Sequence, residues 1–414
     1  MNSFILKAAV AIAIVPLSLD VTRRFIETRF ASSSSASLTL WFLLSRIALA
    51  VLAFELLPMK LPSDPAHYYA AVGQMVLTSG RTDASPYSPG FDYLMAGLWW
   101  LFHTPTSFIW AMIAAESAAF ALTLNALRLA GEPLTAALAA LWFVSPISIF
   151  NVALGGQDEA LILLATAGVL WAAARRRDAL AGAWVACGLV GSKILAGFAA
   201  VPLLSLPGNR MARAVLVALA LTAAATVACV AANIPVLSFL VEAQSISSGN
   251  LWAFASLVSG RSGLVPAGAM LSMATAALLM AMFLIRRRPI DSAMTQMLRA
   301  TGTTGCVFLL FSPKAFASYS LMFLPGILLL LLSLAPLART ALVVGFLPVT
   351  VLEPSLWFRI VPAGLSLPVI GPGRSALLMA DAVLVAGYVL LAWRGLTLHR
   401  VRMKCAPVVQ DRLR

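Results

Sequence analysis

Residues 134–177 read LTAALAALWFVSPISIFNVALGGQDEALILLATAGVLWAAARRR, and this stretch decides the fold. Two apolar runs, at about 134–152 and 158–174, approach the roughly 20 residues that a helix needs to cross a bilayer. A polar turn, GGQDE, separates the runs, and an arginine triplet ends the second. Lipid offers backbone groups no hydrogen-bond partner, so a spanning segment satisfies them internally as a helix. The stretch therefore predicts two consecutive membrane-embedded helices.

The same pattern recurs along the whole chain. Of its 414 residues, 61% are hydrophobic and only 11% are charged, whereas a soluble domain is about one quarter charged. This composition excludes a soluble enzyme, a disordered chain and a nucleic-acid-binding domain. We expect an all-α polytopic membrane protein with about 10–13 transmembrane helices. Several apolar runs are shorter than a full span, which predicts broken or tilted helices.

The domain organisation follows from these runs. Residues 1–400 are expected to form a single transmembrane domain, and residues 401–414 a basic cytoplasmic tail. Residues 58–90 form the first outer loop, which is expected to contain a juxtamembrane helix. The segment 4–20 has a lysine before an apolar run, as in a signal peptide, but no small-residue cleavage site follows. We interpret it as an uncleaved first helix or as an interfacial helix.

The charges predict an orientation. The net charge is +13, and arginine clusters separate alternate apolar runs, including 175–177 and 286–288. Lysine and arginine accumulate in cytoplasmic loops. The arginine clusters and the C-terminus are therefore placed in the cytoplasm, and the chain in the cell (inner) membrane. Seven of the sixteen acidic residues fall on the opposite side, among them Asp64, Asp158 and Glu159, which predicts a functional site facing the periplasm or the exterior.

Two features inside the apolar regions stand out. Both flanks of residues 179–206 are assigned to the cytoplasm, so two half-length helices meeting at Gly191-Ser192-Lys193 are expected, with Lys193 at the tip of the hairpin. Arg46 and Glu116 lie inside predicted spans, where ionisable groups are costly and usually paired. A structural ion pair between them is the simplest account. The four cysteines are widely spaced and indicate neither a disulfide framework nor a metal site.

The outer side carries three polar segments. In the first, Asp64-Pro65 fits a helix start with Asp as the N-cap and Pro at the first helical position, or a carboxylate that faces a cavity as a base. In the second, Gly155-Gly156 allows a tight turn before Gln157, Asp158 and Glu159. These three side chains either stabilise the next helix start or bind sugar hydroxyls.

The third segment, 312–319, contains Lys314. Lys193 and Lys314 either extend toward the membrane surface or bind an anionic group such as a phosphate. Arg81 is a weaker candidate for the same role. No cofactor is called for, and a divalent cation is compatible with the segments but not indicated.

These segments, in this order, resemble the GT-C class of integral membrane glycosyltransferases, and within it the bacterial polyprenyl-phosphate-mannose-dependent mannosyltransferases. The resemblance covers about residues 60–330 and is most specific over 145–202. It is carried by Asp64 with Tyr68 or Tyr69 and Gly80; Ser145-Pro146 followed by Gly156-Gln157-Asp158; Ala181-Gly182, Gly188, Lys193 and Pro202; and Ser312-Pro313-Lys314, Tyr319 and Pro325.

The resemblance implies a GT-C-like fold and an inverting transfer of mannose or another hexose or pentose from a polyprenyl-monophosphate donor. The acceptor would be a glycan or glycolipid on the non-cytoplasmic face, with membrane lipids around the enzyme. Asp64 would remove the acceptor proton, and cations would bind the donor phosphate. The implied phosphate-binding residues are Lys193, Lys314 and Arg81, and the implied sugar- or acceptor-binding residues are His67, Tyr68, Gln157, Asp158, Glu159 and Tyr319.

A different class of function remains open. A membrane transporter or a flippase of a lipid-linked sugar would also carry charges inside its spans, here Arg46, Glu116 and Asp381. The chain shows no internal repeat of the kind that is common in transporters, and its first outer loop is long and polar. A ligase that uses a diphosphate-linked donor is a third alternative, which would need more cations on the outer side.

Overall fold

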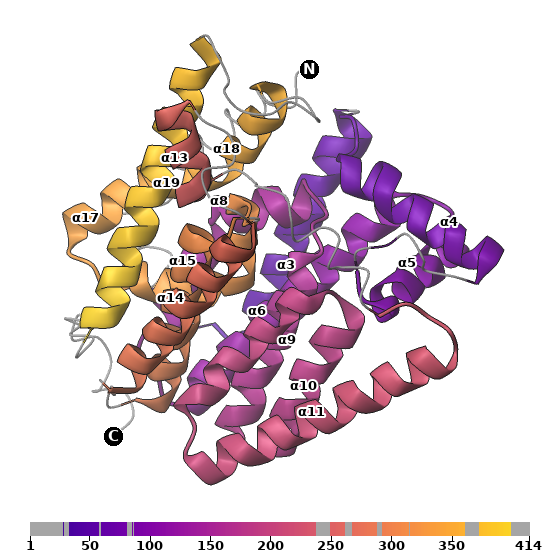
Figure 1. Cartoon of the computed structure of the whole chain (residues 1–414), viewed down its shortest axis with the longest axis horizontal. Helices are drawn as coiled ribbons and strands as arrows, with labels where there is room; N and C mark the ends of the chain where they lie inside the picture. The colour runs from indigo at the N-terminus through magenta and orange to yellow at the C-terminus, as the bar shows by residue number, and fades with distance from the viewer. Residues whose placement is uncertain are drawn as a thin grey trace.

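The computed structural model describes residues 28, 33–57, 59–80, 85, 87–236, 249–260, 267–287, 292–313, 315–360 and 372–398. Within these residues every regular element is a helix and there is no strand, as expected for an all-α protein (Figure 1). The elements are α3 (Ser35–Val51), η2 (Leu52–Leu56), η3 (Asp64–Tyr69), α4 (Ala70–Ser79), α5 (Pro89–Phe102), α6 (Thr106–Leu129), α7 (Thr135–Phe143), α8 (Pro146–Ser148), η4 (Ile149–Ala153), α9 (Glu159–Ala174), α10 (Asp178–Gly191), η5 (Ile194–Ser205), α11 (Gly208–Ala231), α13 (Leu251–Ser259), α14 (Ala267–Arg287), α15 (Ala293–Phe311), η6 (Ala317–Phe323), α16 (Leu324–Leu332), α17 (Pro336–Ala341), η7 (Leu342–Phe346), α18 (Leu347–Ile360) and α19 (Pro372–Thr397).

The protein is an all-α, multi-pass membrane protein. Five helical stretches of the described chain are long and apolar enough to cross a bilayer: 35–56, 106–129, 208–231, 336–357 and 373–397. A sixth span would combine Thr135–Phe143 with Pro146–Ala153, which are bent by 49° at their junction. Shorter apolar helices, such as Glu159–Ala174, lie among them. The finer count of 10–13 spans therefore stays a prediction.

The core of the protein is formed by helices that are buried on nearly all sides. Every residue of α16 from Leu324 to Leu332 is buried, and α15 is buried almost throughout. These two helices touch through Gly302 and Gly326, where a Cβ atom on either glycine would collide with the backbone of the other. Because glycine carries no side chain, the two backbones can approach this closely.

Helix α11 lies at the edge of the molecule (Figure 1). Of its 24 residues only Ala214 and Ala218 are buried, and they face Gly182 of α10. The remainder of its apolar surface is exposed, as expected for a helix in contact with lipid.

The break predicted around Lys193 is confirmed. Helix α10 ends at Gly191, and η5, a 12-residue stretch of 3₁₀ helix, begins at Ile194. Between them Lys193 has an extended backbone conformation, and Ser192, with φ −138° and ψ −98°, is neither helical nor extended. Neither helix is long enough to cross a bilayer of about 30 Å alone, so Lys193 lies at the junction of two short helices.

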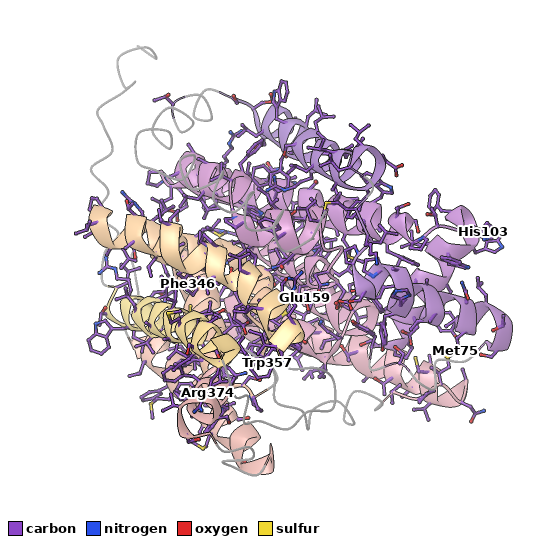
Figure 2. All side chains as sticks on the ribbon, turned by 90° about the horizontal axis from the view of Figure 1, so that it is seen from above. Met75, His103, Glu159, Phe346, Trp357 and Arg374 are labelled. Carbon is purple, nitrogen blue, oxygen red and sulfur yellow. The ribbon has the colours of Figure 1, made fainter. Side chains whose placement is uncertain are left out.

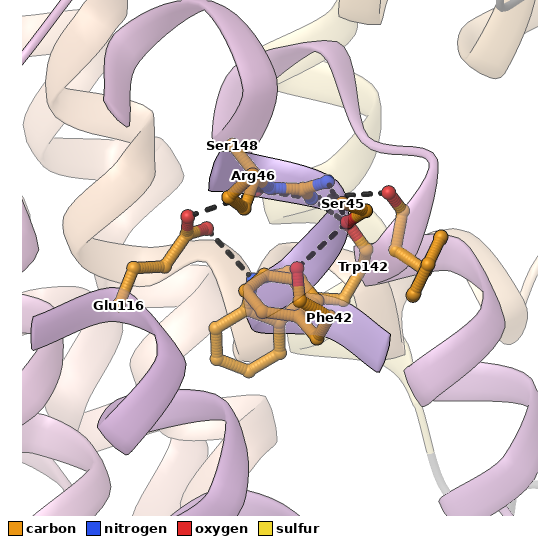
Figure 3. A network of polar contacts seen from close by, with 7 residues as sticks. Phe42, Ser45, Arg46, Glu116, Trp142 and Ser148 are labelled. Atoms are coloured by element: carbon orange, nitrogen blue, oxygen red, sulfur yellow. Dashed lines mark hydrogen bonds and ion pairs between the residues drawn. The ribbon is translucent and has the colours of Figure 1, made fainter. Parts of the chain in front are cut away.

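The predicted ion pair between Arg46 and Glu116 is also confirmed. Arg46 Nε lies 3.7 Å from Glu116 Oε2, and both side chains are buried (Figure 3). The guanidinium also donates to Ser148 Oγ and to the Trp142 and Phe143 carbonyl oxygens. Glu116 in turn accepts a hydrogen bond from Trp142 Nε1. The network connects α3, α6 and the bent α7–α8 segment, so its role is structural.

The first outer loop folds as a helical hairpin. Tyr69, Val72, Gly73 and Val76 are buried, and Leu77 is exposed. The buried face of α4 packs against α5, since a Cβ on Gly73 would lie 3.0 Å from the Met95 carbonyl oxygen. Met75 and His103, on this hairpin, lie at one edge of the molecule, whereas Glu159 lies inside it (Figure 2). The segments 4–20 and 401–414 lie outside the described residues.

Candidate functional site

The first two polar segments meet the α10–η5 junction around the carboxylate of Asp158. This side chain is 2% exposed and precedes α9. Its Oδ1 accepts hydrogen bonds from the Tyr69 hydroxyl at 3.3 Å and the Tyr87 hydroxyl at 3.5 Å. Lys193 Nζ lies 3.0 Å from its Oδ2. Asp158 therefore links the η3 helix, the start of α5 and the α10–η5 junction.

Lys193 lies between two carboxylates. Besides Asp158, it donates to Glu159 Oε1 at 2.6 Å. The lysine side chain is 12% exposed and Glu159 is 1% exposed. Two carboxylates and one ammonium give this buried group a net negative charge when all three are ionised. An ammonium has three N–H donors, so one N–H remains after these two partners.

The environment of the tyrosines keeps them protonated. Burial, reinforced by the negative charge of Asp158, raises the pKa of the Tyr69 hydroxyl well above its usual range. Burial and Asp158 likewise raise the pKa of Tyr87. Both hydroxyls therefore act as donors to Asp158 at neutral pH. Their rings belong to one aromatic cluster, in which Tyr87 stacks on Phe91 with the ring centroids 4.3 Å apart.

Asp64 and Gln157 form the more accessible part of the site. Gln157 Nε2 donates to Asp64 Oδ2 at 2.8 Å, and both side chains are half-buried. The interpretation of Asp64 as an N-cap is wrong: η3 begins at Asp64, and no side chain caps its backbone. The Asp64 side chain is directed instead to Gln157, across 93 residues of sequence.

The Gly155-Gly156 turn, which the sequence predicted, brings Asp64 and Gln157 together. Gly156 has φ +59°, a left-handed conformation that favours glycine. A Cβ atom there would lie 2.8 Å from Pro65 Cγ and 3.0 Å from Ile109 Cγ1. The backbone N–H of Gln157 donates to the Asn151 carbonyl oxygen at 2.8 Å. The turn is thus packed directly against the residue that follows Asp64.

The third polar segment closes the site at Tyr319. Its ring lies 4.8 Å from Lys193 Nζ, a distance at which an ammonium is attracted to an aromatic face. Asn151 Nδ2 donates to the Ser318 carbonyl oxygen at 3.3 Å, which ties this segment to the one that contains Gln157.

Asn250 anchors the same segment from the other side. Its Oδ1 accepts from the backbone N–H groups of Trp252 and Ala253 and so caps α13. Its Nδ2 donates to the carbonyl oxygens of Pro313 at 3.2 Å and Ala315 at 3.4 Å. These are the two neighbours of position 314 in the chain. Lys314 and Arg81, both predicted to bind phosphate, lie outside the described residues.

The other predicted residues divide between the site and its surroundings. Tyr68 is half-buried, and its ring centroid lies 5.6 Å from that of Tyr87. His67 is exposed. Tyr69 and Tyr87 are site residues that the sequence analysis did not select. Tyr69 is the last residue of η3, and Tyr87 lies in the Ser-Pro-Tyr-Ser-Pro stretch before α5. In the sequence, the available signal was a tyrosine within the first polar segment.

An apolar cavity is lined by residues of η5 and α14. It has a volume of about 330 Å³, and its lining includes Ile194, Leu195, Phe198 and Val201 of η5 together with Leu278 and Met282 of α14. The first two lining residues directly follow Lys193 in the chain. The polar cluster and the apolar cavity are therefore neighbours along η5.

The chemistry of the site rests on carboxylates, one ammonium, one amide and phenol groups. In the part of the chain that the structure describes, no group of three or more His, Cys, Asp or Glu side chains could hold a metal ion. No protein-family model matches this chain, and comparison with curated proteins and with solved structures finds no significant similarity.

Proposed function

We propose that this membrane protein is a glycosyltransferase that moves a sugar from a polyprenyl-monophosphate donor to a hydroxyl of a glycan or glycolipid acceptor. The observation that carries the proposal is the order of groups across the site. The half-buried carboxylate of Asp64 is bonded to Gln157, the next two residues in the chain hold the buried ammonium of Lys193, and the residues that follow Lys193 line an apolar cavity. A base, a phosphate-binding cation and a place for a lipid chain are what this reaction needs.

In the proposed reaction Asp64 accepts the proton of the acceptor hydroxyl. The acceptor oxygen forms a bond to the anomeric carbon while the bond from that carbon to the phosphate oxygen breaks. The polyprenyl phosphate leaves with the electron pair, and attack from the opposite face inverts the anomeric carbon. Gln157, Tyr68, Tyr319 and His67 are proposed to contact the sugar or the acceptor.

The donor phosphate is proposed to approach the remaining N–H of Lys193, with Lys314 and Arg81 as further cations. Because Asp158 and Glu159 already neutralise Lys193, this lysine alone cannot attract a phosphate strongly. The proposal therefore needs the two additional cations. The apolar residues of η5 and α14 are proposed to contact the first isoprene units of the lipid.

The proposed orientation places Asp64, Gln157 and Lys193 at the non-cytoplasmic face of the inner membrane and the C-terminus in the cytoplasm. It rests on the distribution of arginines. A single cysteine introduced at position 410 should stay unlabelled by a membrane-impermeant maleimide in intact cells. Labelling from outside would reverse the orientation.

The proposal is tested by transfer from a synthetic polyprenyl-phosphate-mannose to an acceptor glycolipid, with the purified protein in nanodiscs. Asp64→Asn preserves the size of the side chain and its ability to accept from Gln157. We expect turnover to fall by about 10²–10⁴-fold, as for a lost general base, with donor binding nearly unchanged. Normal turnover of the Asn variant would remove Asp64 from the mechanism and direct attention to Asp158 or Glu159.

Asp381 favours a second candidate, the flipping of a lipid-linked sugar. This buried carboxyl lies in α19 next to Glu353 of α18, and ionisable groups inside spans often serve transport. Proteoliposomes with a fluorescent polyprenyl-phosphate sugar distinguish the two functions. Movement of the lipid across the bilayer without sugar transfer, abolished by Asp381→Asn, would favour the flippase.

A further inference from the structure

The two carboxylate oxygens of Asp64 have different hydrogen-bond partners. Oδ2 accepts a hydrogen bond from Gln157 Nε2 at 2.8 Å. Oδ1 is 3.3 Å from the hydroxyl of Ser63, an exposed residue. A carboxylate hydrogen bond of 2.8 Å is strong, whereas an exposed hydroxyl at 3.3 Å competes with water. One oxygen is therefore fixed by the protein, and the other is available to a substrate.

The orientation of the Gln157 amide follows from the chemistry of its partner. An ionised carboxylate only accepts hydrogen bonds, so the NH₂ group of Gln157 must face it. The amide oxygen of Gln157 then points elsewhere.

The backbone of Gln157 is held independently of its side chain. Its N–H donates to the Asn151 carbonyl oxygen, and its own carbonyl oxygen accepts from the N–H of Ala160. The preceding residue, Gly156, packs on Pro65, which directly follows Asp64. The two side chains are thus fixed relative to each other by a contact between their neighbours.

We propose that Gln157 is a positioning residue, which holds Oδ2 of Asp64 so that Oδ1 faces the acceptor hydroxyl. The inference rests on the proposed transferase function and changes the role of Gln157 from sugar binding to orientation of the base. A free carboxylate would rotate about its Cβ–Cγ bond and present either oxygen. A misplacement of about 1 Å in a reacting group can cost on the order of 10²-fold in rate.

Gln157→Glu is the sharpest test because it retains the shape and exchanges the donor for a second carboxyl group. Two carboxyls at hydrogen-bond distance share a proton, and a like charge disfavours ionisation. The other titratable groups around Asp64, namely Tyr69, Asp158, Glu159, Lys193 and the exposed His67, stay the same. We expect the acidic limb of the kcat profile to move upward by at least about one pH unit, with activity recovering at higher pH.

Gln74→Glu is the matched control. It adds the same charge to α4 of the same hairpin, at an exposed position, and should leave the profile in place. A shift of similar size in both variants, or no shift in Gln157→Glu, would overturn the inference.

Gln157→Met gives a second measurement that does not depend on the added charge. It keeps the length of the side chain and removes the N–H groups that bond Asp64. The kcat should therefore fall by about 10²-fold, with the KM for the polyprenyl-phosphate sugar nearly unchanged. If Gln157 binds the sugar instead, KM rises and kcat changes little, which overturns the inference even if the Glu variant fails to fold. Absence of transfer by the wild-type protein would count against the proposed function instead.

Discussion

The amine of Lys193 lies 2.6 Å from a carboxylate oxygen of Glu159, and both groups are almost completely buried. Asp158 lies within 3.0 Å of the same amine. A buried charge is stable only when groups of opposite charge lie beside it, so Lys193, Asp158 and Glu159 depend on one another. The predicted phosphate-binding lysine is therefore also part of the internal structure of the site.

Lys193→Met should destabilise the protein by about 3–5 kcal/mol, because two buried carboxylates lose their common cation. In Lys193→Met/Glu159→Gln only one carboxylate remains, so part of the thermal stability in detergent should return. Donor affinity is measured in the same variants. Loss of a charge-assisted phosphate contact costs on the order of 1.5–3 kcal/mol. A double variant with recovered stability and normal donor affinity would mean that Lys193 serves the fold alone.

The Arg46–Glu116 pair gives a prediction about stability without a change in transfer. Arg46→Met leaves Glu116 buried without its cation and should cost about 3–5 kcal/mol. Arg46→Met/Glu116→Met removes both charges and should recover most of this loss. Thermal unfolding in detergent measures both effects. If the folded double variant lost transfer activity per molecule, the pair would have a role beyond structure.

Gly156→Ala tests the contact that joins Asp64 to Gln157. The new methyl group would meet Pro65 at 2.8 Å and would also occupy a left-handed backbone position. Gly131→Ala is the matched control, since Gly131 has φ +67° and open space around it. Each left-handed alanine costs about 1–2 kcal/mol, but only the change at Gly156 should reduce transfer strongly. Equal transfer by the two variants would contradict the described packing.

Tyr69 and Tyr87 predict how stability changes at alkaline pH. Burial and Asp158 raise the pKa of both hydroxyls in the folded protein, whereas an unfolded tyrosine loses its proton near pH 10. Below about pH 10 both states keep the protons, so these groups add no pH dependence. Above it the unfolded state releases protons that the folded state retains, and stability falls by about 1.4 kcal/mol per pH unit for each tyrosine.

Tyr87→Phe should therefore show a shallower fall of the unfolding temperature above pH 10 than the wild type. Tyr93→Phe, which removes an exposed hydroxyl of α5, is the control. Parallel curves for the wild type and Tyr87→Phe would contradict the prediction.

Features that depend on local sequence could be predicted. The apolar runs define helices, and Gly191-Ser192 marks the break before Lys193. Gly156 marks a turn, because no other residue accepts its backbone conformation easily. The Arg46–Glu116 pair could also be predicted, since charges buried in apolar helices need each other.

Contacts that depend on how distant helices turn toward each other could not be predicted in detail. Lys193 and Glu159 are 34 residues apart, and from the sequence Lys193 is expected to extend toward the membrane surface or to bind a phosphate. The N-cap interpretation of Asp64 failed because a tertiary partner, Gln157, determines its orientation. Of the adjacent rings Tyr68 and Tyr69, Tyr69 is fully buried and meets Phe91 and Phe108 edge to face, which is a contact between segments distant in the sequence.

Asn250 has a mechanical consequence for the third polar segment. One fully buried amide caps α13 with its oxygen and, with its nitrogen, contacts both neighbours of position 314. The oxygen and the nitrogen of the amide lie in one plane, so a rotation that breaks the hydrogen bonds of one also breaks those of the other. A displacement of α13 is therefore transmitted to the turn between α15 and η6, and with it to Tyr319 and the ammonium that its ring faces. Asn250 thus couples the position of α13 to the position of the third polar segment.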